Sequence, residues 1–111
     1  MKSFYNYFKF PLWTDGIFVW DANDTMVATV LFENDNRARF IARAINGITP
    51  VIDAKASYSR SDQIVYMRGE PILMIRGFGH LTSQSGCNLS NDDACNIQDE
   101  LGEWIAQQLN R

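Results

Sequence analysis

One stretch of the sequence, residues 63–81, constrains the fold more than any other. It holds two apolar runs of strand length, 64–67 and 72–75, rich in residues that suit a half-buried sheet surface. Between them lie Gly69, which tolerates positive φ, and Pro71, which lacks a backbone N–H. We therefore predict a β-hairpin whose second strand starts at or after Pro71.

A second pair of apolar runs, 17–20 and 26–32, flanks the segment 21–25, whose Asp and Asn side chains favour a turn. This pattern predicts another hairpin. Residues 33–36 then supply helix-capping side chains, and apolar residues recur at helical spacing until Gly47, where we expect a helix to end.

A longer helix is predicted after the central hairpin. Ser90, with Asp93 three residues later, resembles a capping box. The apolar stripe that follows consists of Ala94, Ile97, Leu101, Trp104, Ile105 and Leu109.

The two hairpin-and-helix runs suggest an internal repeat. The strands of the first predicted hairpin match those of the second at an offset of 46 residues, as Phe18 does with Ile64 (64 − 18). In the helices, Ile41 matches Ile97 at an offset of 56 residues (97 − 41). We predict a single domain, 1–111, of two ββα units, 16–48 and 63–111, the second with a loop insertion at 79–88. The expected fold class is α+β, with one mainly antiparallel sheet and two helices packed on one face. The same order is also a circular permutation of the ferredoxin-like order, which would bring some parallel pairing.

The remaining segments carry weaker patterns. The aromatic-rich segment 4–10 predicts an N-terminal strand, and 13–16 reads as a turn. Thr49 and Pro50 favour a short helical turn reaching Ala56, and 57–62 is typical of a polar connector.

Composition limits the possible classes of protein. A chain of 111 residues that is 46% hydrophobic can bury a core without disulfides. It has no apolar run near the ~20 residues of a membrane span and no signal-peptide pattern, so we expect a cytoplasmic protein. Cys87 and Cys95 lack the spacing of a redox or zinc site, and reduced thiols are favoured over a disulfide there.

Catalytic and cofactor motifs are absent from the sequence. It has no phosphate-binding Gly-Lys-Ser/Thr loop, no HExxH and no EF-hand pattern, so we expect no cofactor or metal. A catalytic triad would need the sole histidine, His80, with Ser83, Ser85 or Cys87 as nucleophile, and the spacing does not favour one. We expect a non-enzymatic protein.

Charge is unevenly distributed along the chain. The net charge is −3, and residues 77–111 contain five acidic side chains against Arg111 alone. This balance argues against a surface dedicated to nucleic acid. Arg37, Arg39 and Arg43 on the first predicted helix are nevertheless the best nucleic-acid feature, since guanidinium groups on one helix face can contact successive phosphates.

The loop insertion is the leading candidate site, because insertions in repeats often map to a working surface. Phe78 lies between two glycines there, an arrangement that suits a contact residue or a ring folded back onto the core. The predicted interaction surface joins the acidic face of the last helix to five residues: Arg76, Phe78, His80, Thr82 and Gln84.

Three segments resemble sequences that recur in small uncharacterised phage and prophage proteins: NDNRARFIARAIN (34–46), RGFGHLT (76–82) and DDACNIQDELGEWIAQQLN (92–110). The resemblance implies a phage or prophage origin and assigns no catalytic residue. The chain departs from the pattern at Ser83, Gln84 and Ser85, where more glycine is expected.

These observations favour a small cytoplasmic α+β interaction module that binds a protein partner or itself, without a membrane. The alternative is a nucleic-acid-binding regulatory protein that uses the first helix.

Overall fold

The computed structural model describes residues 4–31, 35–47, 52–76, 81 and 89–110, with the backbone alone for 35–38. The elements follow one another along the chain: a 3-10 turn η1 (Phe4–Asn6), β1 (Trp13–Thr14), β2 (Phe18–Trp20), β3 (Met26–Val30), α1 (Asp35–Ile45), β4 (Ala56–Ser59), β5 (Ile64–Met67), β6 (Glu70–Ile75) and α3 (Asn91–Leu109).

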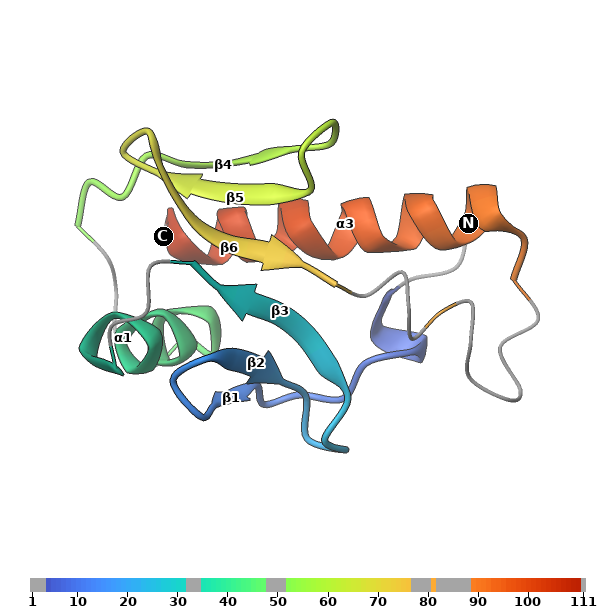
Figure 1. Cartoon of the computed structure of the whole chain (residues 1–111), viewed down its shortest axis with the longest axis horizontal. Helices are drawn as coiled ribbons and strands as arrows, with labels where there is room; N and C mark the ends of the chain where they lie inside the picture. The colour runs from blue at the N-terminus through green and yellow to red at the C-terminus, as the bar shows by residue number, and fades with distance from the viewer. Residues whose placement is uncertain (1–3, 32–34, 48–51, 77–80, 82–88, 111) are drawn as a thin grey trace.

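The six strands form one sheet in the order β1-β2-β3-β6-β5-β4, and every neighbouring pair is antiparallel (Figure 1). Both predicted hairpins form, and β3 and β6 join them at the centre of the sheet. The predicted start of the second strand at or after Pro71 is wrong, because Glu70 already pairs with Met67 and begins β6. The predictions of an α+β fold and of antiparallel pairing are confirmed.

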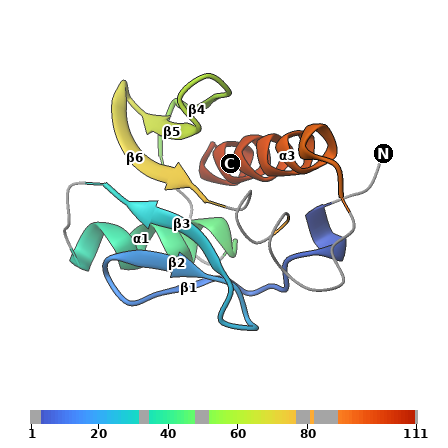
Figure 2. The same cartoon turned by 45° about the vertical axis from the view of Figure 1, so that its right-hand side comes forward.

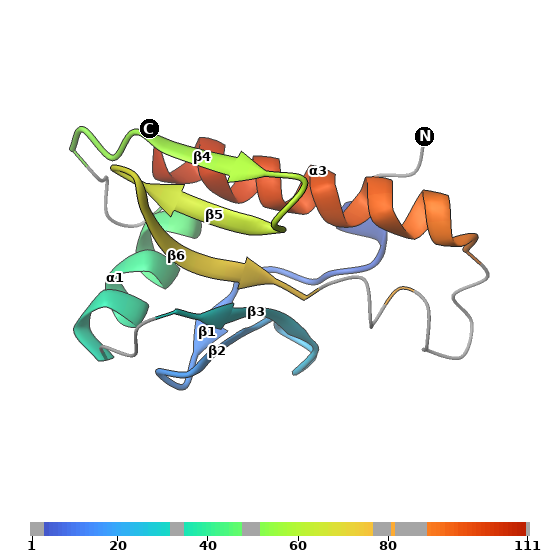
Figure 3. The ribbon, with the colours of Figure 1, turned by 45° about the horizontal axis from the view of Figure 1, so that its top comes forward.

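Both helices lie on the same side of the sheet, as the turned views show (Figures 2 and 3). α3 runs against β4 and β5, while α1 contacts α3 and β1. Ser90 caps α3 as predicted, because its hydroxyl accepts the Asp93 N–H at 3.2 Å. Neither helix in the described part of the chain has the length and apolar composition needed to cross a bilayer.

The core lies between the sheet and the helices. Strand residues that pair across the centre, such as Ala28 with Ile75, are buried together. The predicted stripe of α3 supplies Ile97, Leu101 and Ile105, all buried. Burial of this apolar surface is the main source of stability for such a fold.

Two segments differ from the sequence predictions. Residues 4–10 were expected to form a strand, but Phe4–Asn6 is a 3-10 turn, because its rings pack against α3 rather than entering the sheet. The polar segment 57–62 was expected to be a connector, but Ser57 to Ser59 belong to the edge strand β4.

Smaller differences concern the starts of strands. Trp13 and Thr14, expected in a turn, form β1, and Ala56, expected to end a helical turn, begins β4. Residues 49–51 of that expected turn lie outside the described residues.

The predicted pair of ββα units is not established by the element order alone. The strand order across the sheet is not sequential, and α1 has 11 residues whereas α3 has 19.

Candidate interaction site

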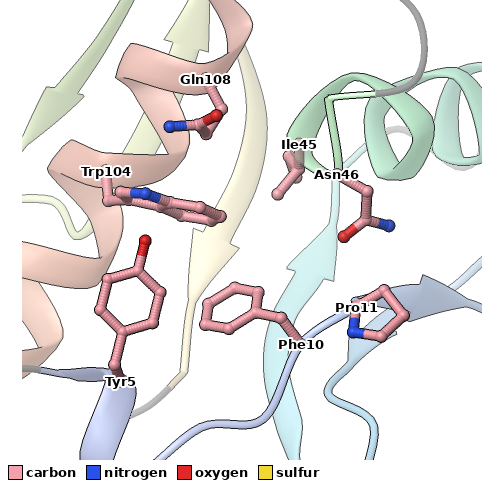
Figure 4. A pocket seen from close by; sticks show the side chains of 7 residues that line it. All are labelled: Tyr5, Phe10, Pro11, Ile45, Asn46, Trp104 and Gln108. Carbon is pink, nitrogen blue, oxygen red and sulfur yellow. The ribbon is translucent and has the colours of Figure 1, made fainter.

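An apolar pocket of about 390 Å³ opens where the N-terminal segment meets the ends of the two helices. Trp104 and Tyr5 lie beside Phe10 on one side of it, and the C-terminal end of α1 lies on the other (Figure 4). Its seven lining residues are Tyr5, Phe10, Pro11, Ile45, Asn46, Trp104 and Gln108.

The N-terminal segment is held in place by backbone and side-chain anchors. The N–H groups of Tyr7 and Phe8 both donate to the Phe4 carbonyl at 3.0 Å, which closes the 3-10 turn, and the Phe8 ring is 1% exposed. The Lys9 N–H donates to the buried carboxylate of Asp21 at 3.0 Å. These anchors fix the position of the aromatic wall of the pocket.

Trp104 is the centre of that wall. Its ring centroid lies 4.8 Å from Phe10 and 5.5 Å from Phe4, both at steep angles typical of favourable aromatic contacts. Tyr5 stacks on Phe4 at 4.4 Å and is 52% exposed, so part of the aromatic surface faces solvent.

The polar side chains of the pocket carry amide, hydroxyl and indole groups. The Asn46 side chain donates to the Leu12 carbonyl at 2.6 Å and accepts its N–H at 2.9 Å. The Tyr5 hydroxyl, the Trp104 indole N–H and the Gln108 amide are the other polar side-chain groups, and the seven residues include no carboxylate, imidazole, thiol or amine. No group of three potential metal ligands occurs within the described ranges.

Acidic side chains lie along α3, the helix that contributes Trp104 to the pocket. Glu100 precedes Trp104 by one helical turn and so lies on the same face. Asp92 and Asp93 are exposed in the first turn. On the side facing β4, Asp99 and Glu103 are already paired with Arg60, at 3.6 and 2.7 Å.

The predicted interaction surface is described only in part. Arg76 is exposed just after β6, and its guanidinium donates to the Met74 sulfur at 3.4 Å. Phe78, His80, Thr82 and Gln84 lie outside the described residues, as does the insertion 79–88 except for Leu81, which is buried.

The arginines of α1 are partly described. Arg39 and Arg43 are exposed, while the side chain of Arg37 lies outside the described part of the chain. Arg39 lines a small pocket of about 160 Å³ with Thr14, Asp15 and Gly16. Backbone N–H donors, first Phe18 and then Ile17, lower the pKa of Asp15, so a negative charge stays beside Arg39.

Sequence reasoning did not find the aromatic pocket. Trp104 was predicted only as one residue of a helical stripe, and the segment 4–10 was interpreted as a strand. The density of aromatic residues in 4–10, next to Pro11, was the signal for a packed, non-strand segment.

Comparisons with protein-family models, curated proteins and solved structures found no match.

Proposed function

We propose that this protein is a non-enzymatic interaction module that binds a basic segment of a partner protein, with one apolar side chain of that segment entering the aromatic pocket. The observation that carries the proposal is the position of Trp104, ringed by aromatic side chains and following Glu100 on the same helix face.

The apolar part of the proposal follows from the pocket. Its volume lies within the range of about 300–1,000 Å³ common for binding pockets, and its walls are mostly rings and aliphatic groups. Tryptophan and tyrosine in such pockets often supply much of the binding energy of a protein interface. An aromatic or long aliphatic side chain is the ligand that fits these walls.

The basic part follows from charge. Asp92, Asp93 and Glu100 lie on α3, and the described length of that helix, residues 91–109, contains no basic residue. Complementary charge would speed association and orient the bound segment along the helix.

Further properties belong to the same proposal. We place the protein in the cytoplasm, with a phage or prophage origin and with Arg76 and the loop insertion as secondary contacts. We also retain the two ββα units, each a hairpin followed by a helix, which the antiparallel pairing of β2 with β3 and of β5 with β6 supports.

The test is a titration of isotope-labelled protein with a short lysine-rich peptide that contains one phenylalanine. We expect saturable shifts of the Trp104 indole and of Gln108, with binding weakened by salt. Trp104→Ala should weaken binding about tenfold or more, the scale of an interface hot spot.

Three controls make the result decisive. The same peptide with alanine in place of phenylalanine should bind at least about tenfold more weakly, and Glu100→Lys should weaken binding of the original peptide. Tyr5→Ala tests the exposed edge of the pocket if Trp104→Ala unfolds the protein. Peptide-induced shifts that avoid the pocket, or no shifts at millimolar peptide, would reject the proposed function.

A further inference from the structure

We infer that the chain is an internally duplicated molecule built from two βββα units, β1–β3 with α1 and β4–β6 with α3, related by a pseudo-two-fold axis through the central strand pair. The unit is one strand longer than the hairpin-and-helix pattern of the sequence. The inference concerns how the molecule is built and does not depend on the proposed function.

The sheet order supports the axis. In the order β1-β2-β3-β6-β5-β4, each unit has its first strand at an edge of the sheet, its second strand next to it and its third strand at the centre. A non-sequential order is therefore what a two-fold arrangement of two consecutive three-stranded units produces.

The middle and last strands of the units match in detail. β2 and β5 are irregular at equivalent places, between Val19 and Trp20 and between Val65 and Tyr66. The five residues of β3 and residues 71–75 of β6 share one burial sequence: half-buried, buried, buried, half-buried, buried.

Backbone hydrogen bonds repeat as well. The Val30 N–H donates to the Ile17 carbonyl at 2.8 Å, and the Ile75 N–H donates to the Gln63 carbonyl at 2.8 Å. The offset of 46 predicted from the sequence holds for Ile17 and Gln63 (63 − 17), but Val30 and Ile75 differ by 45 (75 − 30). The residues of the central pair, Thr29 and Met74, also differ by 45 (74 − 29). The axis therefore passes through that pair.

The closing contact of each unit is an asparagine clasp, defined as Asn46 on Leu12 and Asn110 on Ala56. Each asparagine directly follows its helix, donates its amide to the backbone carbonyl (2.6 and 2.8 Å) and accepts the backbone N–H (2.9 and 2.6 Å). The two clasped residues are 44 apart (56 − 12), the same offset that relates β1 to β4, where Trp13 corresponds to Ser57.

The clasps align the helices at their C-terminal ends. Asn46 and Asn110 differ by 64 residues (110 − 46). At this offset the sequence FIARAIN (40–46) aligns with WIAQQLN (104–110). Three apolar pairs are buried in both helices: Ile41 with Ile105, Ala42 with Ala106 and Ile45 with Leu109. The extra length of α3 is then an extension at its N-terminus, and the helix offset is 64 rather than the 56 read from apolar spacing.

Any antiparallel strand pair has a local two-fold axis, but that axis does not require distant features to match. Here the strand irregularities, the burial of the third strands and the two clasps all agree with it. The chain thus corresponds to a symmetric dimer joined into one polypeptide.

The first test replaces each clasp in turn, Asn46→Asp and Asn110→Asp. At neutral pH a carboxylate accepts the N–H but repels the carbonyl, so both variants should show similarly lowered urea midpoints. The carbonyl raises the pKa of the introduced carboxyl in the folded state. The stability that each variant loses relative to wild type should therefore be regained below about pH 4, the pKa of the carboxyl in the unfolded state. The loss should develop as pH rises through the pKa of the carboxyl in the folded state.

Asn23→Asp, at an exposed position in the β2–β3 turn, is the matched control and should show no such recovery. Loss of stability in one clasp variant without the other would overturn the equivalence.

The second test exchanges residues 27–30 (VATV) with residues 72–75 (ILMI). The register of β3 with β6 means that the exchange recreates the same three central pairs with their strands reversed: Ala28 with Ile75, Thr29 with Met74 and Val30 with Leu73. The exchanged residues also meet equivalent neighbours in β2 and β5 only if the axis relates the whole units. We expect the reciprocal exchange to fold with a urea midpoint above that of either one-sided replacement. A midpoint lowered by the sum of the two one-sided effects would overturn the duplication.

Discussion

Tyr58 shows how one side chain joins the sheet edge to the last helix. Its hydroxyl donates to the Asp99 carboxylate at 2.8 Å, and Asp99 also lies 3.6 Å from the Arg60 guanidinium. Burial raises the pKa of Tyr58 well above its ordinary value, and the hydrogen bond and negative charge of Asp99 add to the shift. The phenol therefore stays neutral in the folded protein.

Tyr58→Phe tests this contact through its pH dependence. The unfolded tyrosine ionises near pH 10 while the folded one keeps its proton, so its contribution to stability is full below about pH 10 and falls as pH rises towards the folded pKa. We expect the variant to be less stable than wild type by about 1 kcal/mol at pH 8, with a smaller difference at pH 11, in urea unfolding.

Tyr66→Phe is the comparison, because the Tyr66 hydroxyl bonds Asp62 at the exposed surface, 3.0 Å away. It should have a smaller effect at pH 8. A difference between wild type and Tyr58→Phe that stays constant from pH 8 to 11 would contradict the role given to the buried phenol.

At the scale of elements, the packing of α3 on β4 depends on a glycine. A Cβ at position 102 would overlap the ring of Tyr58. Gly102 is buried inside α3, where glycine is otherwise a poor helix former. Close packing of the helix on the sheet edge explains why glycine is present.

Gly102→Ala should therefore destabilise the protein. Alanine gains about 1 kcal/mol of helix propensity, but overpacking costs about 1–3 kcal/mol, so we expect a net loss in thermal or urea unfolding. Gln107→Ala, at an exposed position of the same helix, should be close to neutral. A more stable Gly102→Ala protein would mean that the ring moves aside freely.

The sequence predicted those elements whose own pattern decides their structure. The two hairpins and α3 have periodic apolar residues and turn or cap residues at their ends. β4 was missed because its serines give it little apolar pattern, and Tyr58 packs on a helix 41 residues away in sequence. Tertiary contacts, not local propensity, make this segment a strand.

The same distinction applies to the pocket. Phe10, Ile45 and Trp104 come from three separate segments, so no spacing along the chain relates them. Their apolar character was visible in the sequence, but the surface they form depends on how the N-terminal segment crosses the helices.

At the scale of the whole molecule, charge separates the two candidate functions. The net charge is −3, and Asp15 stands beside Arg39 at the small pocket. We therefore expect no complex with short duplex DNA at moderate salt, measured by light scattering. A mass increase that falls steeply with salt and is lost in Arg39→Glu would instead support nucleic-acid binding.

The asparagine clasps also bear on the two edges of the sheet. β1 and β4 are the two edges of the sheet, and edge strands can recruit strands from other chains. Asn110 occupies both backbone hydrogen-bonding groups of Ala56, and Asn46 occupies those of Leu12, next to β1. Each side-chain amide thus takes the place of an incoming peptide, and loss of a clasp would leave an edge open to aggregation.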